Sequence, residues 1–347
     1  MTAPSFASLV TLLTGWVFAH RRTITRMIQA AGETASKHFS SYHRLFSAAR
    51  WSLDRLGLIV FELIRPWCGE VVMLALDDTL ARKRGLKMFG TGMHYDPLPS
   101  SRGMAITNWG HSWVVRGVIV EFPFRKGHYY CLPILFRMSL NQKSATQHRR
   151  AYRSRPEFAV EMLQVLCGSH HNLRFHVVAD SASGGQSVLC HWPTNCDLTS
   201  RLVTDARLYA AAPARQPGSK GRPRLRGELL PTPPAMLTAR CRRVTLEIYG
   251  RREQARLADQ LAHVHAAPNR PLPVVAVEAL PEGRGQEAFD STCAEATSEQ
   301  VLTGYAMRWS IEVTNYDAKQ HLGFEDPQGW TRAAAQRTAP IAMLLDS

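Results

Sequence analysis

The segment Tyr305-Ala-Met-Arg308-Trp-Ser-Ile-Glu312-Val-Thr-Asn-Tyr-Asp-Ala-Lys319 gathers four functional groups on one side of a predicted helix. At about 100° per residue from Tyr305, Arg308 lies at about −60°. Glu312 lies at about −20° and Lys319 at about −40°. A phenol, a guanidinium, a carboxylate and an ammonium therefore share one narrow face, whereas surface helices usually spread charge over a wide arc. The alternative is a solvated face with an i, i+4 ion pair between Arg308 and Glu312.

Two more acidic positions follow apolar runs of strand length. Residues 71–76 are continuously apolar, which is typical of a strand buried on both faces, and the run ends in Asp77-Asp78-Thr79. Residues 173–179 are predicted to form a second strand, and its apolar end is followed by Asp180. Acids at the end of a buried strand cost free energy unless they pair or bind a cation. Because side chains alternate along a strand, only one of Asp77 and Asp78 would point into a shared site.

The order of predicted elements is that of a mixed α/β core. Residues 113–121 and 129–138 are β-rich and are joined by a hairpin signal at residues 123–127. Residues 145–167 are then predicted to be helical, and residues 198–204 to form a further strand. Together with the two acid-bearing runs, this gives three strands, a helix and two more strands. We assign residues 69–204 to the first part of a core domain.

Helical spacing dominates the start of the chain. Leu9, Leu12, Leu13 and Trp16 repeat at helix spacing, and residues 38–51 interleave basic and aromatic side chains. We interpret residues 1–68 as a helical DNA-binding domain, with an ordinary helical bundle as the alternative.

A long segment separates the second acidic position from the third. About 130 residues lie between Asp180 and Glu312, far more than one strand and one helix require. We therefore predict a β-rich insertion over residues 205–298, which includes a basic loop around Arg222. The core would resume at residues 299–347.

The composition favours a polyanionic partner. The 347 residues carry 42 Lys and Arg against 28 Asp and Glu, a formal net charge of +14. This excess fits double-stranded DNA, although charge for solubility is the simpler alternative. The apolar run at residues 5–19 is shorter than the roughly 20 residues of a membrane span, and its charges follow it, unlike those of a signal peptide. We expect a cytoplasmic, nucleoid-associated protein with no membrane contact and no small-molecule substrate.

The pattern Tyr305-x2-Arg308-x3-Glu312-x6-Lys319 resembles the third catalytic block of bacterial insertion-sequence DDE transposases, which belong to the ribonuclease H-like superfamily. The resemblance covers roughly residues 20–335. It implies a ribonuclease H-like fold whose first and fourth strands lie side by side, with the helix of the third acid packed across the sheet. It also favours Asp77 over Asp78, because the first block of these proteins begins with Asp-x-Thr.

The resemblance also implies an activity. Such proteins cut element ends at terminal inverted repeats and join them to target DNA. Asp77, Asp180 and Glu312 would hold two Mg²⁺ ions, for which Mn²⁺ can substitute, because hard cations prefer carboxylate oxygens. Work on two DNA ends implies at least a homodimer on DNA. The residues expected to contact DNA are Tyr305, Arg308 and Lys319 of the block and Lys83 and Arg222 of two basic loops.

Two alternatives share this fold. An inactive DNA-binding remnant is one, because the resembled proteins usually continue with further helix after the segment equivalent to residues 339–345. A two-metal nuclease without strand transfer is the other. The complete set of three acids disfavours the first, and the long insertion with the Tyr305, Arg308 and Lys319 set disfavours the second. Neither the repeat sequence, the target preference nor the excision route follows from the sequence.

Overall fold

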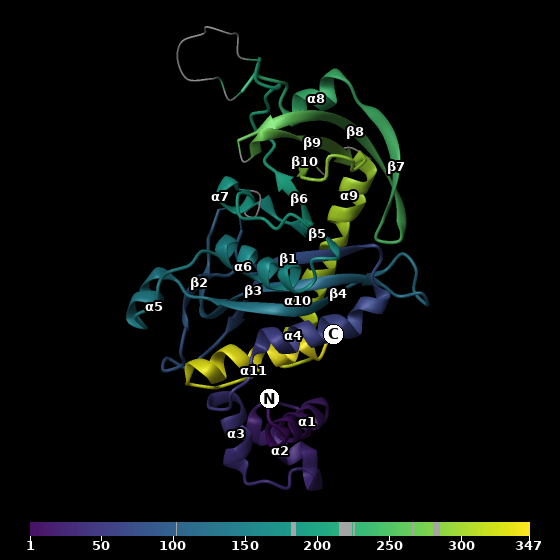
Figure 1. The fold of residues 1–347 in the computed structure, drawn as a ribbon. Coiled ribbons are helices and arrows are strands. Elements are labelled where there is room, and N and C mark those ends of the chain that lie inside the picture. The colour runs from purple at the N-terminus through teal and green to yellow at the C-terminus, as the bar shows by residue number, and fades with distance from the viewer. Residues whose placement is uncertain (102, 182–184, 215–223, 225, 266, 280–284) are drawn as a thin grey trace.

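The computed structural model describes residues 1–101, 103–181, 185–214, 224, 226–265, 267–279 and 285–347. The N-terminal helices form a unit at one end of the molecule, and the strands of residues 242–279 lie at the opposite end (Figure 1). The elements of the N-terminal unit are α1 (Ala3–Phe18), α2 (Ile24–Ala31), the short 3₁₀ helix η1 (Gly32–Thr34) and α3 (Phe39–Ser47).

A mixed sheet runs through the remainder of the described chain. Its strand order is β2-β3-β1-β5-β6-β10-β9-β8-β7, and β4 pairs with the free side of part of β3. The first strands are β1 (Val71–Arg82), β2 (Gly92–Tyr95), β3 (Thr107–Glu121), β4 (Tyr129–Ser139), β5 (Arg174–Ala179) and β6 (Cys196–Leu202). The remaining strands are β7 (Arg242–Ile248), β8 (Arg251–Val264), β9 (Ala267–Ala279) and β10 (Gln286–Ser291).

The first and fourth predicted strands are neighbours, as expected. Strand β1 pairs in parallel with β5 from Val71 to Ala75, and β5 in turn pairs in parallel with β6. The expected end of β1 at Asp77 was wrong. The strand continues to Arg82 because β3 pairs with it throughout that segment. Asp77 and Asp78 therefore lie where β1 has already lost its β5 neighbour but is still held by β3.

Alternation along the strands divides the core between the two faces of the sheet. Leu74 and Leu76 of β1 belong to an apolar cluster with α6 (Arg155–Ser169). Ala75 belongs to a second cluster, together with Ile311 of α10 (Trp309–Gln320) and residues of α11 (Arg332–Leu344). Because side chains alternate, Asp77 faces the α10 side and Asp78 faces the α6 side. The remaining helices are α4 (Leu53–Ile64), η2 (Arg65–Trp67), α5 (Gln142–Gln147), α7 (Gln186–Leu189), α8 (Pro233–Ala239) and α9 (Ser298–Met307).

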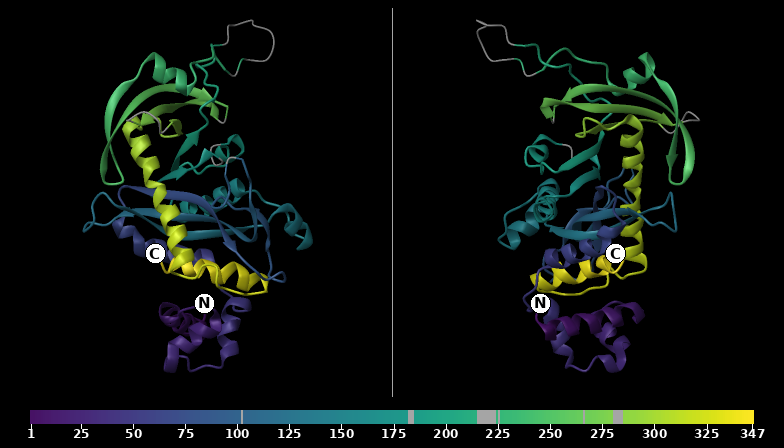
Figure 2. Two further views of the ribbon diagram at one scale, coloured as in Figure 1. Left: turned by 180° about the vertical axis from the view of Figure 1, so that it is seen from behind. Right: turned by 45° about the vertical axis from the view of Figure 1, so that its right-hand side comes forward.

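The segment Tyr305–Lys319 is not one uninterrupted helix. Helix α9 ends at Met307, and α10 begins at Trp309 with Arg308 between them. The amide of Arg308 donates to the Tyr305 carbonyl, and the amide of Ile311 donates to the Arg308 carbonyl, both at i−3 spacing. Arg308 keeps αR dihedral angles, so the two helices form one long column beside the sheet (Figure 2).

The strands of residues 242–291 extend the core sheet. Strand β10 pairs antiparallel with β6, and β9, β8 and β7 follow by antiparallel pairing. Strands near residues 244–249 and 274–280 were expected, but β8 and β10 were not. Charged and polar residues occupy much of β8, whose side chains are partly exposed, so no apolar run marked it.

Within the described ranges, no helix combines the length and the hydropathy that crossing a bilayer requires.

The close approach of α4 to the sheet gives a stability prediction. A Cβ atom added to Gly57 would overlap the carbonyl oxygen of Ile134 in β4, so Gly57→Ala should lower the free energy of unfolding by about 1–3 kcal/mol. A Cβ atom on Gly168 in α6 meets no atom within 4 Å, so Gly168→Ala should raise that free energy by up to about 1 kcal/mol. Urea unfolding of both variants checks the pair, and equal effects would contradict the packing of α4.

Candidate active site

The two neighbouring acids of β1 have different partners. The Asp77 carboxylate accepts a hydrogen bond from Asn315 Nδ2 of α10 at 3.0 Å. Asp78 instead pairs with Arg155 at the start of α6, at 2.7 Å between Oδ2 and Nη1. This division follows from the alternation of the strand and places only Asp77 on the side of α10.

Arg308 lies between the first and the third acidic position. Its Nη2 is 2.5 Å from Glu312 Oε1, and its Nη1 is 3.8 Å from Asp77 Oδ1. The guanidinium also lies 5.6 Å from the centre of the Tyr305 ring. Burial alone would lower the pKa of Arg308, but Tyr305, Asp77 and Glu312 raise it overall. A single partly buried cation thus compensates two carboxylates that would otherwise repel each other.

The protonation of Asp77 reflects this crowding. Burial raises the pKa of Asp77 from 3.8 to about 7, and Arg308 opposes that rise. The negative charges of Asp78 and Glu312 raise it further. Asp77 is therefore a carboxyl group that takes up a proton near neutral pH unless additional positive charge arrives.

Asp180 follows β5 at the same edge of the sheet. It is exposed, and its Oδ1 accepts a hydrogen bond from the Ser181 amide at 2.7 Å. Its charge acts on two neighbours: it raises the pKa of Asp78 and that of Tyr305, although burial is the main cause of both increases. The three predicted acids therefore end on adjoining elements at one edge of the sheet, with Asp180 on the side of Tyr305.

Lys319 lies in the last turn of α10, near the same acids. Burial lowers its pKa, and the charges of Glu325, Asp96 and Asp77 oppose that decrease. A partly desolvated ammonium of this kind can approach a phosphate with little further loss of hydration.

The oxygen atoms at this edge fit a hard divalent cation. Asn315 Oδ1 is buried beside Asp77 and has no hydrogen-bond partner, and carboxylate oxygens are the ligands that Mg²⁺ prefers. In this conformation, the described residues contain no group of three His, Cys, Asp or Glu side chains close enough to hold a metal ion. Arg308 already supplies positive charge between Asp77 and Glu312, so it would have to move before a metal ion could contact both.

Lys83 does not line this site. It is 7% exposed, and its Nζ donates to the carbonyl oxygens of Glu325 at 2.7 Å and Pro327 at 3.1 Å. The expected contact of Lys83 with DNA is therefore not retained, because its ammonium is used inside the protein. Arg222, the other basic-loop residue expected at DNA, lies outside the described residues.

Sequence reasoning overlooked Asn315. It lies three residues after Glu312, so helical spacing alone could have placed it on the same face. No sequence pattern predicted that Arg155 would pair with Asp78. That pairing depends on how α6 packs on the sheet.

Hollows lie beside α9 and beyond β6, close to the elements that carry the candidate acids. A cavity of about 400 Å³ lies beside α9, and its lining includes Tyr249, Phe289, Tyr305, Arg308 and Trp309. A second, of about 500 Å³, lies beyond β6, and its lining includes Arg201, Arg207, Tyr209 and Arg226.

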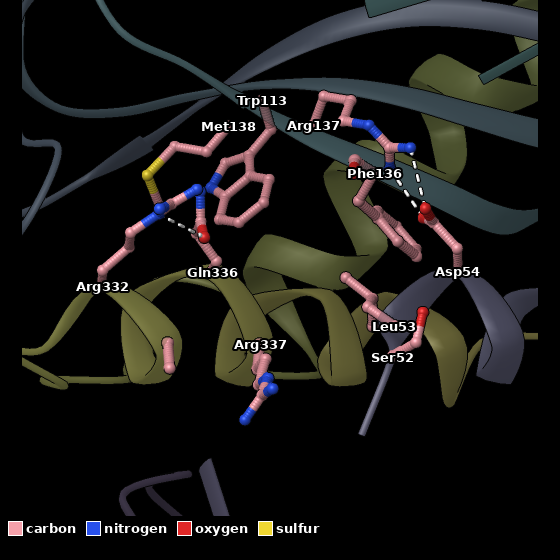
Figure 3. Close-up of a pocket in the computed structure, with 11 residues that line it drawn as sticks. Ser52, Leu53, Asp54, Trp113, Phe136, Arg137, Met138, Arg332, Gln336 and Arg337 are labelled. Carbon is pink, nitrogen blue, oxygen red and sulfur yellow. Dashed lines mark hydrogen bonds and ion pairs between the residues drawn. The ribbon is translucent and has the colours of Figure 1, made fainter. Parts of the chain in front are cut away.

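A further hollow, of about 450 Å³, lies between α4, the sheet and α11 (Figure 3). Four of its polar side chains form two pairs: Arg137 pairs with Asp54, and Arg332 Nε donates to Gln336 Oε1 at 3.2 Å. None of the candidate acids lines it, so we do not connect it with catalysis.

Comparison with known proteins identifies a family for most of the chain. The family model described as "DDE superfamily endonuclease" matches residues 5–262, about three quarters of the sequence. The match includes Asp77 and Asp180, whereas Glu312 lies outside it. A search of curated proteins finds no match.

The raised pKa of Asp77 predicts a pH-dependent cost to stability in metal-free buffer. The folded chain binds a proton at Asp77 more tightly than the unfolded chain, so the free energy of unfolding falls as pH rises from about 4 to about 7. Asp77→Asn should remove this loss and raise the free energy of unfolding by roughly 2 kcal/mol at pH 8, with little effect at pH 4. Urea unfolding at both pH values measures it, with the exposed Glu33→Gln as control. An equal effect at both pH values would contradict the assignment.

The buried ammonium of Lys83 predicts a structural phenotype. Lys83→Met leaves the carbonyl groups of Glu325 and Pro327 without a donor, so it should lower the free energy of unfolding by about 2 kcal/mol. Lys87→Met, an exposed change in the same loop, should leave stability unchanged. Thermal unfolding and DNA binding measured together test this assignment. Weaker DNA binding with unchanged stability would restore the role expected from the sequence.

Proposed function

The chain belongs to the DDE superfamily endonuclease family, and on this premise we propose that it is a DNA transposase of an insertion sequence. It would cut element ends at terminal inverted repeats and join them to target DNA. The observation that carries the proposal is the arrangement around Arg308, which contacts Asp77 of β1 and Glu312 of α10 while Asp180 ends the neighbouring strand β5.

The three acids have the chemistry that phosphoryl transfer requires. Asp77, Asp180 and Glu312 would hold two Mg²⁺ or Mn²⁺ ions, which when bound activate the attacking oxygen and stabilise the leaving oxygen. We assign Asp77 rather than Asp78 to this set, because Asp77 shares a side of the sheet with Glu312, whereas Asp78 is paired with Arg155.

The basic residues of α9 and α10 would act on the DNA backbone. Arg308 is partly buried against two carboxylates, and its planar guanidinium can bind a phosphate through two nitrogens once those acids gain another cation. Lys319 would contribute a second positive charge near the scissile phosphate. The Tyr305 phenol, which adjoins Asp180 and Arg308, would donate a hydrogen bond to a neighbouring phosphate oxygen.

The remaining parts of the chain have roles in the same proposal. Residues 1–68 would bind the inverted repeat, and residues 69–204 with 299–347 would form the ribonuclease H-like catalytic core. Residues 205–298 would be the β-rich insertion, and the protein would act as a homodimer on double-stranded DNA in the cytoplasm, at the nucleoid. The strong positive charge of the chain supports the choice of DNA as partner.

Cleavage of a labelled element end tests the proposal. DNA that flanks the coding sequence supplies the end, and the intact protein should nick it with Mg²⁺ and fail in EDTA. Glu312→Gln should reduce nicking by at least about a hundredfold, because a lost metal ligand removes several kcal/mol of transition-state stabilisation. The exposed Glu295→Gln is the matched control and should keep full activity. Binding without any nicking by the intact protein would refute an active transposase.

A further inference from the structure

The hollow beyond β6 lies across the sheet from the cavity of Tyr305 and Arg308. Ser200 faces the same side as Asp290, to whose carboxylate it donates a hydrogen bond at 2.5 Å, and both line this hollow. Arg201, the next residue of β6, is paired in register with Phe289, which lines the cavity beside α9. Ser181, which follows Asp180, also lines the hollow. The two spaces therefore open on either side of the sheet edge at which Asp180 lies.

Among the described residues that line this hollow, three guanidinium groups stand against the carboxyl groups of Asp205 and Asp290. Within the described residues, Arg207 has no acidic partner, and Arg226 stacks on Tyr209 at 5.0 Å without one. Arg201 is the exception, since it pairs with Glu287 at 2.9 Å. Two arginines are thus available to an anion without breaking an ion pair.

Tyr209 provides an aromatic surface beside Arg226 in the same hollow. Its amide donates to the His263 carbonyl at 3.0 Å, and its carbonyl accepts from the His263 amide at 2.8 Å. The backbone of Tyr209 is therefore held against β8, and the Arg226 guanidinium lies beside its ring. An aromatic ring beside a cation suits the sugar-phosphate backbone and bases of nucleic acid.

The lining favours a contact that does not depend on sequence. Among the described residues, the lining contains guanidinium, phenol, hydroxyl and imidazole groups and the carboxyl groups of Asp205 and Asp290, but neither Asn nor Gln, the side chains that read adenine through paired hydrogen bonds. Contacts of arginine with phosphate position a duplex without reading its bases.

We propose that the hollow defined by Arg207, Tyr209 and Arg226 binds target DNA, the duplex that receives the cut end. The inference rests on the proposed function and adds the site of the second DNA partner. Strand joining brings two duplexes to one set of acids, so two basic surfaces are required beside them. The basic residues of α9 and α10 serve the element end, and the hollow beyond β6 serves the target on the other side of Asp180.

The test separates the two DNA partners. The double variant Arg207→Ala/Arg226→Ala removes both free cations of the hollow. Its matched control, Arg65→Ala/Arg174→Ala, removes two partly exposed arginines near the opposite, amino-terminal ends of β1 and β5. Three quantities are measured for each protein: nicking of the labelled end, joining of a pre-cut end to a plasmid, and capture of a second duplex without repeats by the protein–end complex.

The proposal expects a selective defect. The double variant should nick normally, while joining and capture fall by about tenfold or more, because each substituted arginine would otherwise donate a charge-assisted hydrogen bond to a phosphate of the target. The control should retain all three activities. Unchanged joining and capture would overturn the proposal, and an equal loss of nicking with loss of end binding would assign the hollow to the element end.

Failure of the proposed function gives a different result. If the intact protein neither nicks nor joins, the capture measurement still decides, because it needs no chemistry. Capture by the intact protein that is abolished in the double variant would then support the hollow as a duplex-binding site while refuting the enzyme. Equal capture by both proteins would refute the hollow.

Discussion

Charge compensation by one arginine is the constraint on which the candidate site depends. Asp77 and Glu312 come from a strand and a helix more than 200 residues apart in sequence, and both approach Arg308. Without that guanidinium, two carboxylates in a partly buried space would repel each other and favour separation of α10 from β1. Arg308 also joins α9 to α10, so the break in the helix and the neutralisation of the acids occur at one residue.

The segment after α10 connects this site to the N-terminal unit. The Leu322 carbonyl accepts a hydrogen bond from Trp16 Nε1 at 2.8 Å, and Asp326 Oδ2 accepts one from the amide of Arg22 at 2.8 Å. Lys83, one residue after β1, donates to the Glu325 carbonyl in the same segment. One short segment thus contacts the N-terminal helices, the end of the acid-bearing strand and the helix of Glu312. A change in the position of the N-terminal unit therefore bears directly on both β1 and α10.

Much of the fold could be predicted from sequence, because apolar runs report buried strands directly. The apolar runs predicted the strand that carries Asp77 and the strand that precedes Asp180, while the family resemblance implied that the two are neighbours, and they pair in parallel. Strand β8 was missed because its residues are partly exposed and charged, so its place depends on pairing with β9 rather than on its own pattern. The burial of the Lys83 ammonium could not be predicted, because it depends on carbonyl groups about 240 residues later in the chain. Local spacing identified the residues of α9 and α10, but it carried no information about which acid of β1 would face them.

The continuous pairing of β6 with β10 has a mechanical consequence. A domain joined by two flexible linkers can rotate at little cost, whereas strands joined by a backbone ladder can move relative to each other only by twisting or by breaking hydrogen bonds. Strands β7 to β9 are therefore a stiff arm attached to the edge of the sheet that carries the acids. A bound duplex that pulls on this arm would therefore twist β6 and, through it, β5, which is followed by Asp180. A flexible hinge would instead relax the same force.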